Sequence, residues 1–168
     1  MRGKCWSGNA DKRSIVMINP TFRPAVPDDA SMCIAIRGLT RENAFSEEDL
    51  RALGITARSW SAGIQDGSSP GVVACLDGRM IGYCFGDRDT GEITVLALLP
   101  AYEGRGIGRT LLGLMIEDFK RKGFKRLFLA CASDPDVRSY GFYRRLGWTA
   151  TGEQDAYGDD ILELSIEQ

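Results

Sequence analysis

The fold of this chain is decided by the stretch Glu92-Ile93-Thr94-Val95-Leu96-Ala97-Leu98-Leu99-Pro100-Ala101-Tyr102-Glu103-Gly104-Arg105-Gly106-Ile107-Gly108-Arg109-Thr110-Leu111-Leu112. Apolar residues fill every position from 95 to 99, which is typical of a central strand covered on both faces. Pro100 cannot donate to a neighbouring strand, so we expect the strand to end there. Three glycines follow at every second position. Behind them lies an apolar stripe at helical spacing: Ile107, Leu111, Met115 and Phe119.

The glycine-rich turn in this stretch is suited to binding phosphate. Without side chains, Gly104, Gly106 and Gly108 leave backbone N–H groups accessible, and the start of the helix adds the positive end of its dipole. Arg105 and Arg109 add two full positive charges. We therefore expect this turn to hold a phosphorylated ligand.

The spacing of the glycines distinguishes between known phosphate loops. A P-loop requires Gly-x-x-x-x-Gly-Lys-[Ser/Thr], and no lysine directly follows these glycines. The dinucleotide fingerprint requires a further glycine where Arg109 or Leu111 stands. The turn resembles instead the pyrophosphate loop of the GNAT superfamily of N-acetyltransferases, [Gln/Arg]-x-x-Gly-x-[Gly/Ala]. Gly106 and Gly108 fit that pattern, whereas Glu103 stands where glutamine or arginine is usual.

The composition indicates an ordinary globular protein. Of the 168 residues, 43% are apolar and 26% are charged. The net charge of −2 gives no reason to expect binding to nucleic acid or to an anionic membrane. The sequence has no histidine, and its five cysteines show no Cys-x-x-Cys spacing, so neither a metal site nor Ser-His or Cys-His catalysis is expected. Reduced, packed thiols in a cytoplasmic protein are the favoured interpretation.

The chain is interpreted as an N-terminal tail, residues 1–18, followed by a single domain, residues 19–168. The basic start lacks the apolar stretch of a signal peptide. No apolar run approaches the roughly 20 residues that a membrane span needs. Because Met17 begins a segment that reads like a natural domain start, an added extension or a misplaced start codon is one hypothesis for the tail.

Periodicity and turn residues predict the remaining elements. Asp77-Gly78 between two apolar runs is a strong hairpin signal. The strand after the central helix should run parallel to the central strand, because a helical crossover joins the two. Asp134 and Pro135 are expected to begin the last helix. The expected elements are strand 21–25, helices 29–39 and 46–64, strands 72–76, 80–85 and 93–99, helix 107–122, strand 125–132, helix 134–146, and strands 148–154 and 161–166.

This order, β-α-α-β-β-β-α-β-α-β-β, resembles the GNAT fold over roughly residues 20–168. A second motif adds to the resemblance, since residues 138–148 (RSYGFYRRLGW) look like the family's Phe-Tyr-x-x-Leu-Gly-[Phe/Trp] helix end. We therefore expect a mixed α/β protein in which a central mixed sheet of about seven strands is flanked by four helices. The antiparallel meander before the glycine turn disfavours a Rossmann fold.

The resemblance implies transfer of an acetyl group from acetyl-CoA to the amine of a small molecule, an amino acid or a peptide. It places the pantetheine arm where the fourth and fifth strands splay apart, along the backbone of Leu96, Ala97 and Leu98, whose amides can also stabilise a developing oxyanion. Asp136 stands where many members carry an asparagine that contacts the cofactor. The implied pyrophosphate site consists of Gly104, Arg105, Gly106, Ile107, Gly108 and Arg109.

Two side chains are candidates for proton transfer. Tyr143 matches the family's tyrosine general acid, and its ordinary pKa of about 10 lets it keep a proton at neutral pH. From position alone, packing beside Phe142 would be its commoner role. Glu92 lies eleven residues before Glu103, the spacing of the catalytic glutamate in histone-acetyltransferase members. An ordinary exposed glutamate is the equally weighted alternative. Cys131 stands where ribosomal-protein N-acetyltransferases carry their base, which disfavours that substrate class.

Two other functions stay open at this point. A non-catalytic acyl-CoA-binding or sensor domain on the same fold is favoured by the departures at Glu103 and Asp136 and disfavoured by Tyr143. A nucleotide-binding oxidoreductase is disfavoured by the glycine spacing and the strand order. The acceptor amine and the oligomeric state are left open, with a homodimer among the options.

Overall fold

The computed structural model describes residues 18–167, so the expectation of a tail lies outside the described residues except at Ile18. The strands and helices, in chain order, are β1 (Thr21–Pro24), α1 (Ala30–Arg37), α2 (Glu47–Ala52), α3 (Ala57–Asp66), β2 (Gly71–Leu76), β3 (Arg79–Gly86), β4 (Ile93–Leu98), α4 (Ile107–Arg121), β5 (Arg126–Cys131), α5 (Arg138–Arg145), β6 (Thr149–Gln154) and β7 (Asp160–Ser165). Short 3₁₀ turns lie at Pro27–Asp29 and Pro100–Tyr102.

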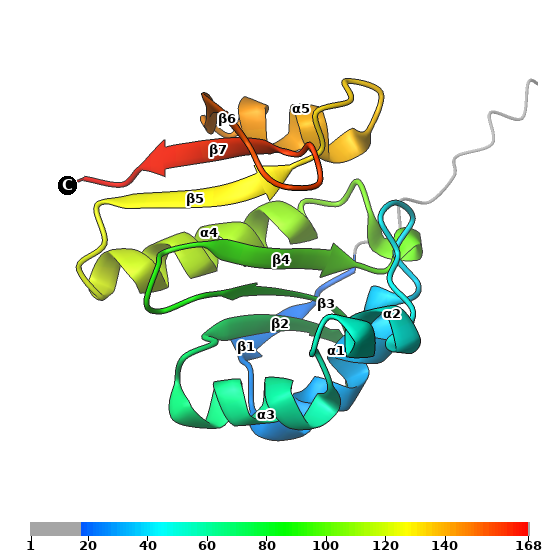
Figure 1. Ribbon diagram of the computed structural model, residues 1–168. Helices are drawn as coiled ribbons and strands as arrows, with labels where there is room; N and C mark the ends of the chain where they lie inside the picture. The colour runs from blue at the N-terminus through cyan, green and yellow to red at the C-terminus, as the bar shows by residue number, and fades with distance from the viewer. Residues whose placement is uncertain (1–17, 168) are drawn as a thin grey trace, which may run out of the picture.

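The strands form two sheets that lie edge to edge (Figure 1). The first sheet has the order β1-β2-β3-β4 and the second has the order β5-β7-β6, and every pair within them is antiparallel. The β2–β3 hairpin turns at Asp77 and Gly78, whose φ angles are +51° and +75°, so the predicted hairpin is confirmed. Within residues 18–167 the structure thus has seven strands, as expected, but in two sheets.

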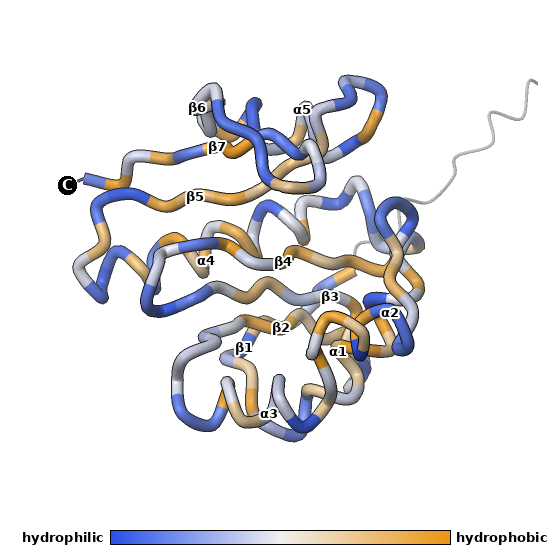
Figure 2. The backbone as a smooth tube through the Cα atoms, viewed as in Figure 1, coloured by the Kyte–Doolittle hydropathy of each residue, from blue (hydrophilic) through white to orange (hydrophobic). Residues whose placement is uncertain are grey.

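The first sheet is covered on both faces. On one face, the predicted stripe of α4 is buried beneath strands of both sheets. On the other face, α1 and α3 contribute Cys33 and Trp60 to a cluster around Tyr83 and Phe85. The Tyr83 hydroxyl donates a hydrogen bond of 2.8 Å to the Cys33 carbonyl. β4 contributes apolar residues to the clusters on both faces, and much of this strand has the apolar colour in Figure 2.

β4 and β5 run parallel, as predicted, and meet at the start of each strand. Glu92 and Phe128 form a parallel bridge, and the Phe128 N–H donates to the Gly91 carbonyl at 3.3 Å. Farther along, the two strands line a common cavity instead of pairing with each other. This separation divides what the sequence predicts as one sheet into two.

The helix expected over residues 46–64 is wrong, because the structure has two helices there. Ser46 and Asp49 form the expected capping box of α2. Gly54 then takes a φ of +78°, a left-handed conformation that ends the helix. Thr56 caps α3 by accepting the Ser59 N–H at 3.1 Å. The apolar repeat continues across the break, so periodicity alone does not reveal it. The fold therefore has five α-helices within the described residues.

The predicted start of the last helix at Asp134 is also wrong, because α5 begins at Arg138. The Asp134 carboxylate accepts the Asp136 N–H at 2.9 Å, and the Asp134 carbonyl accepts the Val137 N–H at 3.1 Å. These bonds close a turn around Pro135, and the helix starts only after that turn.

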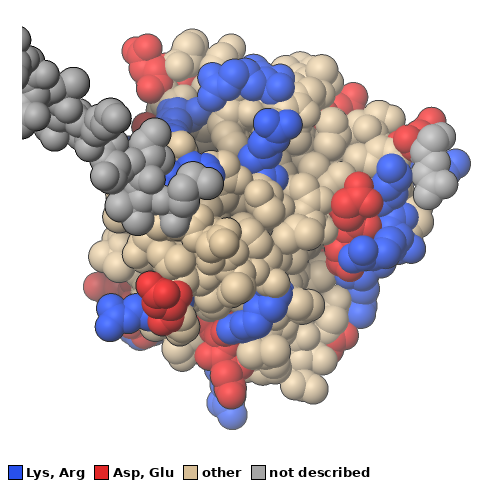
Figure 3. All heavy atoms as spheres, turned by 180° about the vertical axis from the view of Figure 1, so that it is seen from behind, with Lys and Arg blue, Asp and Glu red and all other residues tan. Residues whose placement is uncertain are grey.

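The surface charges, the helices and the cysteines show no feature that points to a membrane or to a disulfide within the described residues. Seen from behind, basic and acidic side chains surround a largely uncharged centre (Figure 3). Among residues 18–167, no helix combines the length and apolar character needed to cross a bilayer. Cys33, Cys75, Cys84 and Cys131 are free thiols.

Candidate functional site

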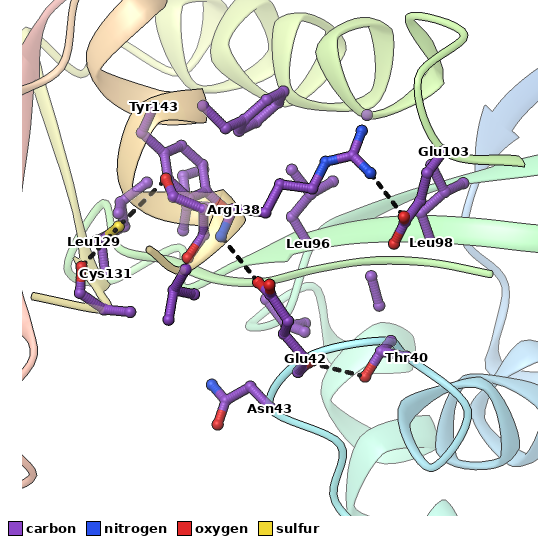
Figure 4. Close-up of a pocket in the computed structure, with 18 of the residues that line it drawn as sticks. Thr40, Glu42, Asn43, Leu96, Leu98, Glu103, Leu129, Cys131, Arg138 and Tyr143 are labelled. Carbon is purple, nitrogen blue, oxygen red and sulfur yellow. Dashed lines mark hydrogen bonds and ion pairs between the residues drawn. The ribbon is translucent and has the colours of Figure 1, made fainter. Parts of the chain in front are cut away.

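A cavity of about 790 Å³ opens where β4 and β5 separate. One wall is the β4 segment 93–98, and the facing wall is the end of β5, residues 129–132. The cavity extends to the glycine turn, defined here as residues 103–109, and to α5. Residues 40–43, in the loop between α1 and α2, complete the lining (Figure 4). Segments that are far apart in the sequence, from residues 37 to 159, therefore meet at one cavity.

The glycine turn has the geometry of an anion site. Gly104 and Gly106 adopt φ angles of +73° and +80°, which residues with a Cβ atom rarely adopt. A Cβ at Gly106 would meet no atom within 4 Å, so open space lies before the turn. Within the described residues no side chain caps α4, and the Thr110 N–H donates back to the Gly106 carbonyl at 3.1 Å. The N–H groups of the helix residues before Thr110 are left for a ligand.

Most of the cofactor residues expected from the sequence lie around this cavity. The exceptions are Arg105, which is exposed within the glycine turn but outside the cavity lining, and Asp136, which is exposed in the turn before α5. The expected residues that line the cavity are Leu96, Ala97, Leu98, Gly104, Gly106, Ile107, Gly108 and Arg109.

Tyr143 lines the cavity and also packs in the fold. Its ring makes edge contacts with Phe142 and Trp148, with centroid separations of 5.0 and 6.1 Å. Phe142 Cζ lies 3.7 Å from the position that a Cβ at Gly108 would take, so α5 rests against the start of α4. Burial raises the pKa of Tyr143, which therefore holds its proton at neutral pH. The packing and catalytic interpretations of this residue are compatible.

Glu92 lies at the bridge between β4 and β5 and is half-buried. Burial raises the pKa of its carboxyl, and the charges of Asp87 and Asp155 raise it further. The residues that line the cavity begin at its neighbour, Ile93. The structure thus places Glu92 beside the cavity and not in its wall.

Asp159, which the sequence did not single out, does lie in the wall of the cavity. Burial and the charges of Asp155 and Asp160 raise the pKa of its carboxyl. Its neighbours are engaged elsewhere: the Asp155 carboxylate accepts the N–H groups of Tyr157 and Asp159 at 2.9 Å each, and Asp160 pairs with Arg144 at 2.9 Å. The turn at 155–160 contains several acidic residues, and its sequence has no pattern that predicts which carboxylate lines the cavity.

Cys131 is a third group in the wall, at the end of β5. Its Sγ lies 3.4 Å from the Ser139 carbonyl, to which it donates. Burial raises the pKa of the thiol, so it is protonated and weakly nucleophilic at neutral pH.

Glu103 joins three segments around the glycine turn. One carboxylate oxygen, Oε2, accepts from Arg41 Nε at 2.9 Å and from Arg138 Nη1 at 2.6 Å. The Glu42 carboxylate accepts the backbone N–H of Arg138 at 3.0 Å, and Figure 4 shows the Glu42 and Glu103 contacts on either side of Arg138. Glu103 is 62 positions from Arg41 and 35 from Arg138, so no local motif could predict this arrangement.

Comparison with known proteins assigns the chain to a family. Residues 34–148 match the sequence profile of the Acetyltransferase (GNAT) family. The chain therefore belongs to the GNAT acetyltransferase family, as the glycine turn and the motif at 138–148 indicated.

Individual relatives agree with this assignment. An uncharacterized N-acetyltransferase ycf52-like of Prochlorococcus marinus is 38% identical over 74 residues, 42% of this chain and 39% of that protein. The chain spans 39% to 63% of the lengths of the curated relatives it matches.

Solved structures share the fold. The paiA N-acetyltransferase of Thermoplasma acidophilum, in complex with coenzyme A, has a TM-score of 0.74 at 22% identity, covering 88% of this chain and 99% of that chain. The ribosomal-protein-S18-alanine N-acetyltransferase of Escherichia coli has a TM-score of 0.67 at 17% identity, covering 89% of this chain and 96% of that chain. At these identities the likeness concerns the fold alone.

Proposed function

We propose that this protein transfers the acetyl group of acetyl-CoA to the amine of a small molecule, an amino acid or a peptide. The observation that carries the proposal is that the glycine turn and Tyr143 face the same cavity between β4 and β5. Membership of the GNAT family and a similar fold solved with coenzyme A support it.

The residues present fit acetyl-CoA. The open space before Gly106, the uncapped start of α4 and the charge of Arg109 suit a pyrophosphate. β4 pairs with β3 along one edge, and its other edge faces the cavity at Leu96–Leu98. Backbone N–H and C=O groups on that edge can pair with the amides of a pantetheine arm, as an added strand would.

The chain's own groups would then divide the chemistry. When bound, acetyl-CoA supplies an activated acetyl group. The cavity-facing amides of β4 stabilise negative charge on the acetyl oxygen. Tyr143, kept neutral by burial, donates its proton to the departing sulfur. An alkylammonium has a pKa near 10.4, so the acceptor amine must lose a proton before it attacks.

Two carboxylates are candidates to accept that proton. Glu92 has the spacing expected from the family and, from its place beside the cavity, would act through water. Asp159 lies in the cavity wall and could accept the proton directly from an amine bound in the cavity. The raised pKa of each makes it a stronger base than an ordinary carboxylate.

The alternative function is an acyl-CoA-binding or sensor domain without catalysis. Glu103 in place of glutamine or arginine, and Asp136 outside the cavity, are the features that favour it. Tyr143 in the cavity wall favours the enzyme.

Calorimetry followed by an amine screen tests the proposal. The unmodified protein should show saturable binding of acetyl-CoA, and CoA should be released when a suitable amine is added. Gly106→Glu should abolish acetyl-CoA binding, because the added carboxylate repels the pyrophosphate and obstructs its site.

Gly123→Glu is the matched control, because Gly123 also has a positive φ, +90°, and open surroundings, but follows the far end of α4. Heat with NAD and none with acetyl-CoA would contradict the proposal. Binding without transfer to any amine in the panel would favour the sensor.

A further inference from the structure

We propose that Glu103 is a positioning residue that holds the guanidinium groups of Arg41 and Arg138 over the glycine turn, where these two arginines bind the phosphate groups of CoA. The inference rests on the proposed function, because it concerns the same cofactor site. It also gives a role to the glutamate that departs from the family pattern.

The burial of the three side chains shows which one supports the others. The Glu103 side chain is only 16% exposed, whereas those of Arg41 and Arg138 are 58% and 52% exposed. The carboxylate therefore lies beneath two guanidinium groups that face outward. A glutamate covered in this way presents little negative charge to a ligand.

Each arginine keeps donors that the carboxylate does not use. Arg41 contacts Glu103 through Nε, so its two terminal amino groups are not engaged in that bond. Arg138 contacts Glu103 through Nη1, and its Nη2 lies 3.9 Å from the position of a Cβ at Gly104. Arg138 thus covers the glycine turn itself, close to where a pyrophosphate is expected.

The charges favour an anion. The Glu103 carboxylate between two guanidinium groups screens the repulsion that would otherwise separate the arginines. With Glu42 at the Arg138 N–H, the two arginines and two carboxylates sum to zero charge, so the net positive charge of the site comes from Arg109 and the start of α4. In the family pattern this position carries glutamine or arginine. Here the donors come from the α1–α2 loop and from α5.

The loop that carries Arg41 is held in place independently. Glu42 accepts the Arg138 N–H at 3.0 Å, which ties this loop to the start of α5. The Arg37 guanidinium donates to the Asn43 carbonyl and lies 4.7 Å from the centroid of the Phe45 ring. Arg41 is therefore presented by a braced segment, which lowers the entropy cost of binding.

The direction in which one substitution changes the affinity for acetyl-CoA distinguishes this proposal from a simple surface ion pair. If Glu103 were only a neighbour of the phosphates, Glu103→Gln would remove repulsion and tighten acetyl-CoA binding. If Glu103 positions the arginines, the same change should weaken binding by about 10-fold, the scale of one charge-assisted hydrogen bond. Arg138→Ala and Arg41→Ala should each weaken binding as well. The double variant Glu103→Gln/Arg138→Ala should lose less than the sum of the two effects.

Titration calorimetry with acetyl-CoA measures these affinities without any acceptor amine. Glu163→Gln is the matched control, because it removes the carboxylate of the Arg126–Glu163 pair (3.0 Å), which joins β5 and β7 at residues outside the cavity lining, and it should leave affinity unchanged. Unfolding midpoints of the unliganded variants verify that each is folded. Unchanged or tighter binding by Glu103→Gln would overturn the inference, as would unchanged binding by both arginine variants. Failure of the wild-type protein to bind acetyl-CoA would instead overturn the proposed function.

Discussion

The ring of Tyr143 packs edge-on against the ring of Trp148, with 6.1 Å between their centroids and 71° between their planes. The contact orients the tyrosine by its ring and does not depend on its hydroxyl. Removing the hydroxyl should therefore leave the packing intact, which allows the two roles of Tyr143 to be separated by experiment.

Tyr143→Phe keeps the ring contacts with Phe142 and Trp148 and removes the proton donor. We expect turnover to fall by about 10²-fold or more, a typical contribution of general acid catalysis. The unfolding midpoint and the affinity for acetyl-CoA should change little. The measurement is the rate of CoA release with the best amine from the screen. An unchanged rate in a folded variant would leave Tyr143 with packing alone.

The pH dependence of kcat/KM should report the proton acceptor. The acceptor must be ionised, and the pKa values of both Glu92 and Asp159 are raised, mainly by burial and further by neighbouring acids. On the acidic side of the profile, kcat/KM should therefore rise with increasing pH as the carboxylate ionises. The pKa that this rise reports should lie above the ordinary carboxylate value of about 4. Glu92→Gln and Asp159→Asn, compared at several pH values, identify the acceptor as the variant whose rate falls and whose profile moves to higher pH. Wild-type profiles in both variants would assign the step to water.

Gly82→Ala, on the neighbouring strand β3, should displace β4 and so disturb the edge of β4 that faces the cavity. Gly82 pairs with Leu98, and a Cβ at position 82 would stand 2.8 Å from both the Ala97 carbonyl oxygen and Leu98 Cδ1. Relieving that overlap moves β4, so we expect a loss of about 1–3 kcal/mol in unfolding free energy and weaker acetyl-CoA binding. Gly113→Ala is the control, because beyond the neighbouring backbone of its own helix no atom lies within 4 Å of the added methyl, and the change should be neutral or stabilising. Thermal melts and calorimetry on both variants decide the matter, and equal behaviour would contradict the prediction.

Asp29→Asn should destabilise the fold in a pH-dependent way. The Asp29 carboxylate accepts two bonds from Arg23, at 2.8 and 2.9 Å, and one from the Val26 N–H at 2.8 Å. The Arg23 hydrogen bonds, and secondarily the Val26 bond, lower the pKa of Asp29 despite its burial. A lowered pKa in the folded state stabilises the protein above the unfolded pKa, near 4, and the benefit is lost as pH falls through the folded value. The variant should lose about 1–3 kcal/mol at pH 7. Denaturant titrations should show that difference shrinking below about pH 4, and a constant difference would contradict the assignment.

The parts of the fold that could be predicted have local causes. Continuous apolar residues before Pro100, alternate glycines and a helical stripe each act over a few positions, so β4, the glycine turn and α4 follow from the sequence. Gly54 shows where such reasoning stops. A glycine inside a helix costs only about 1 kcal/mol relative to alanine, which does not by itself predict a break. The cap that Thr56 provides for α3 favours two helices over one.

The parts of the site that could not be predicted depend on distant contacts. The role of Glu103 is set by arginines far away in the sequence, and the position of Asp159 is set by how Asp155 organises its turn. Single residues at those positions look like ordinary surface charges, and their meaning appears only when the segments meet at the cavity.

The free edge of β4 has one further consequence. If main-chain groups at Leu96–Leu98 bind the cofactor, no side chain there carries the recognition, and a saturation-mutagenesis scan should tolerate any apolar residue that packs. Proline is the exception at a position whose N–H points to the cavity, because it alone lacks that group. This stretch can therefore diverge among descendants of one ancestor without losing the ligand, and a comparison of residue identities would overlook the part of the protein that holds it.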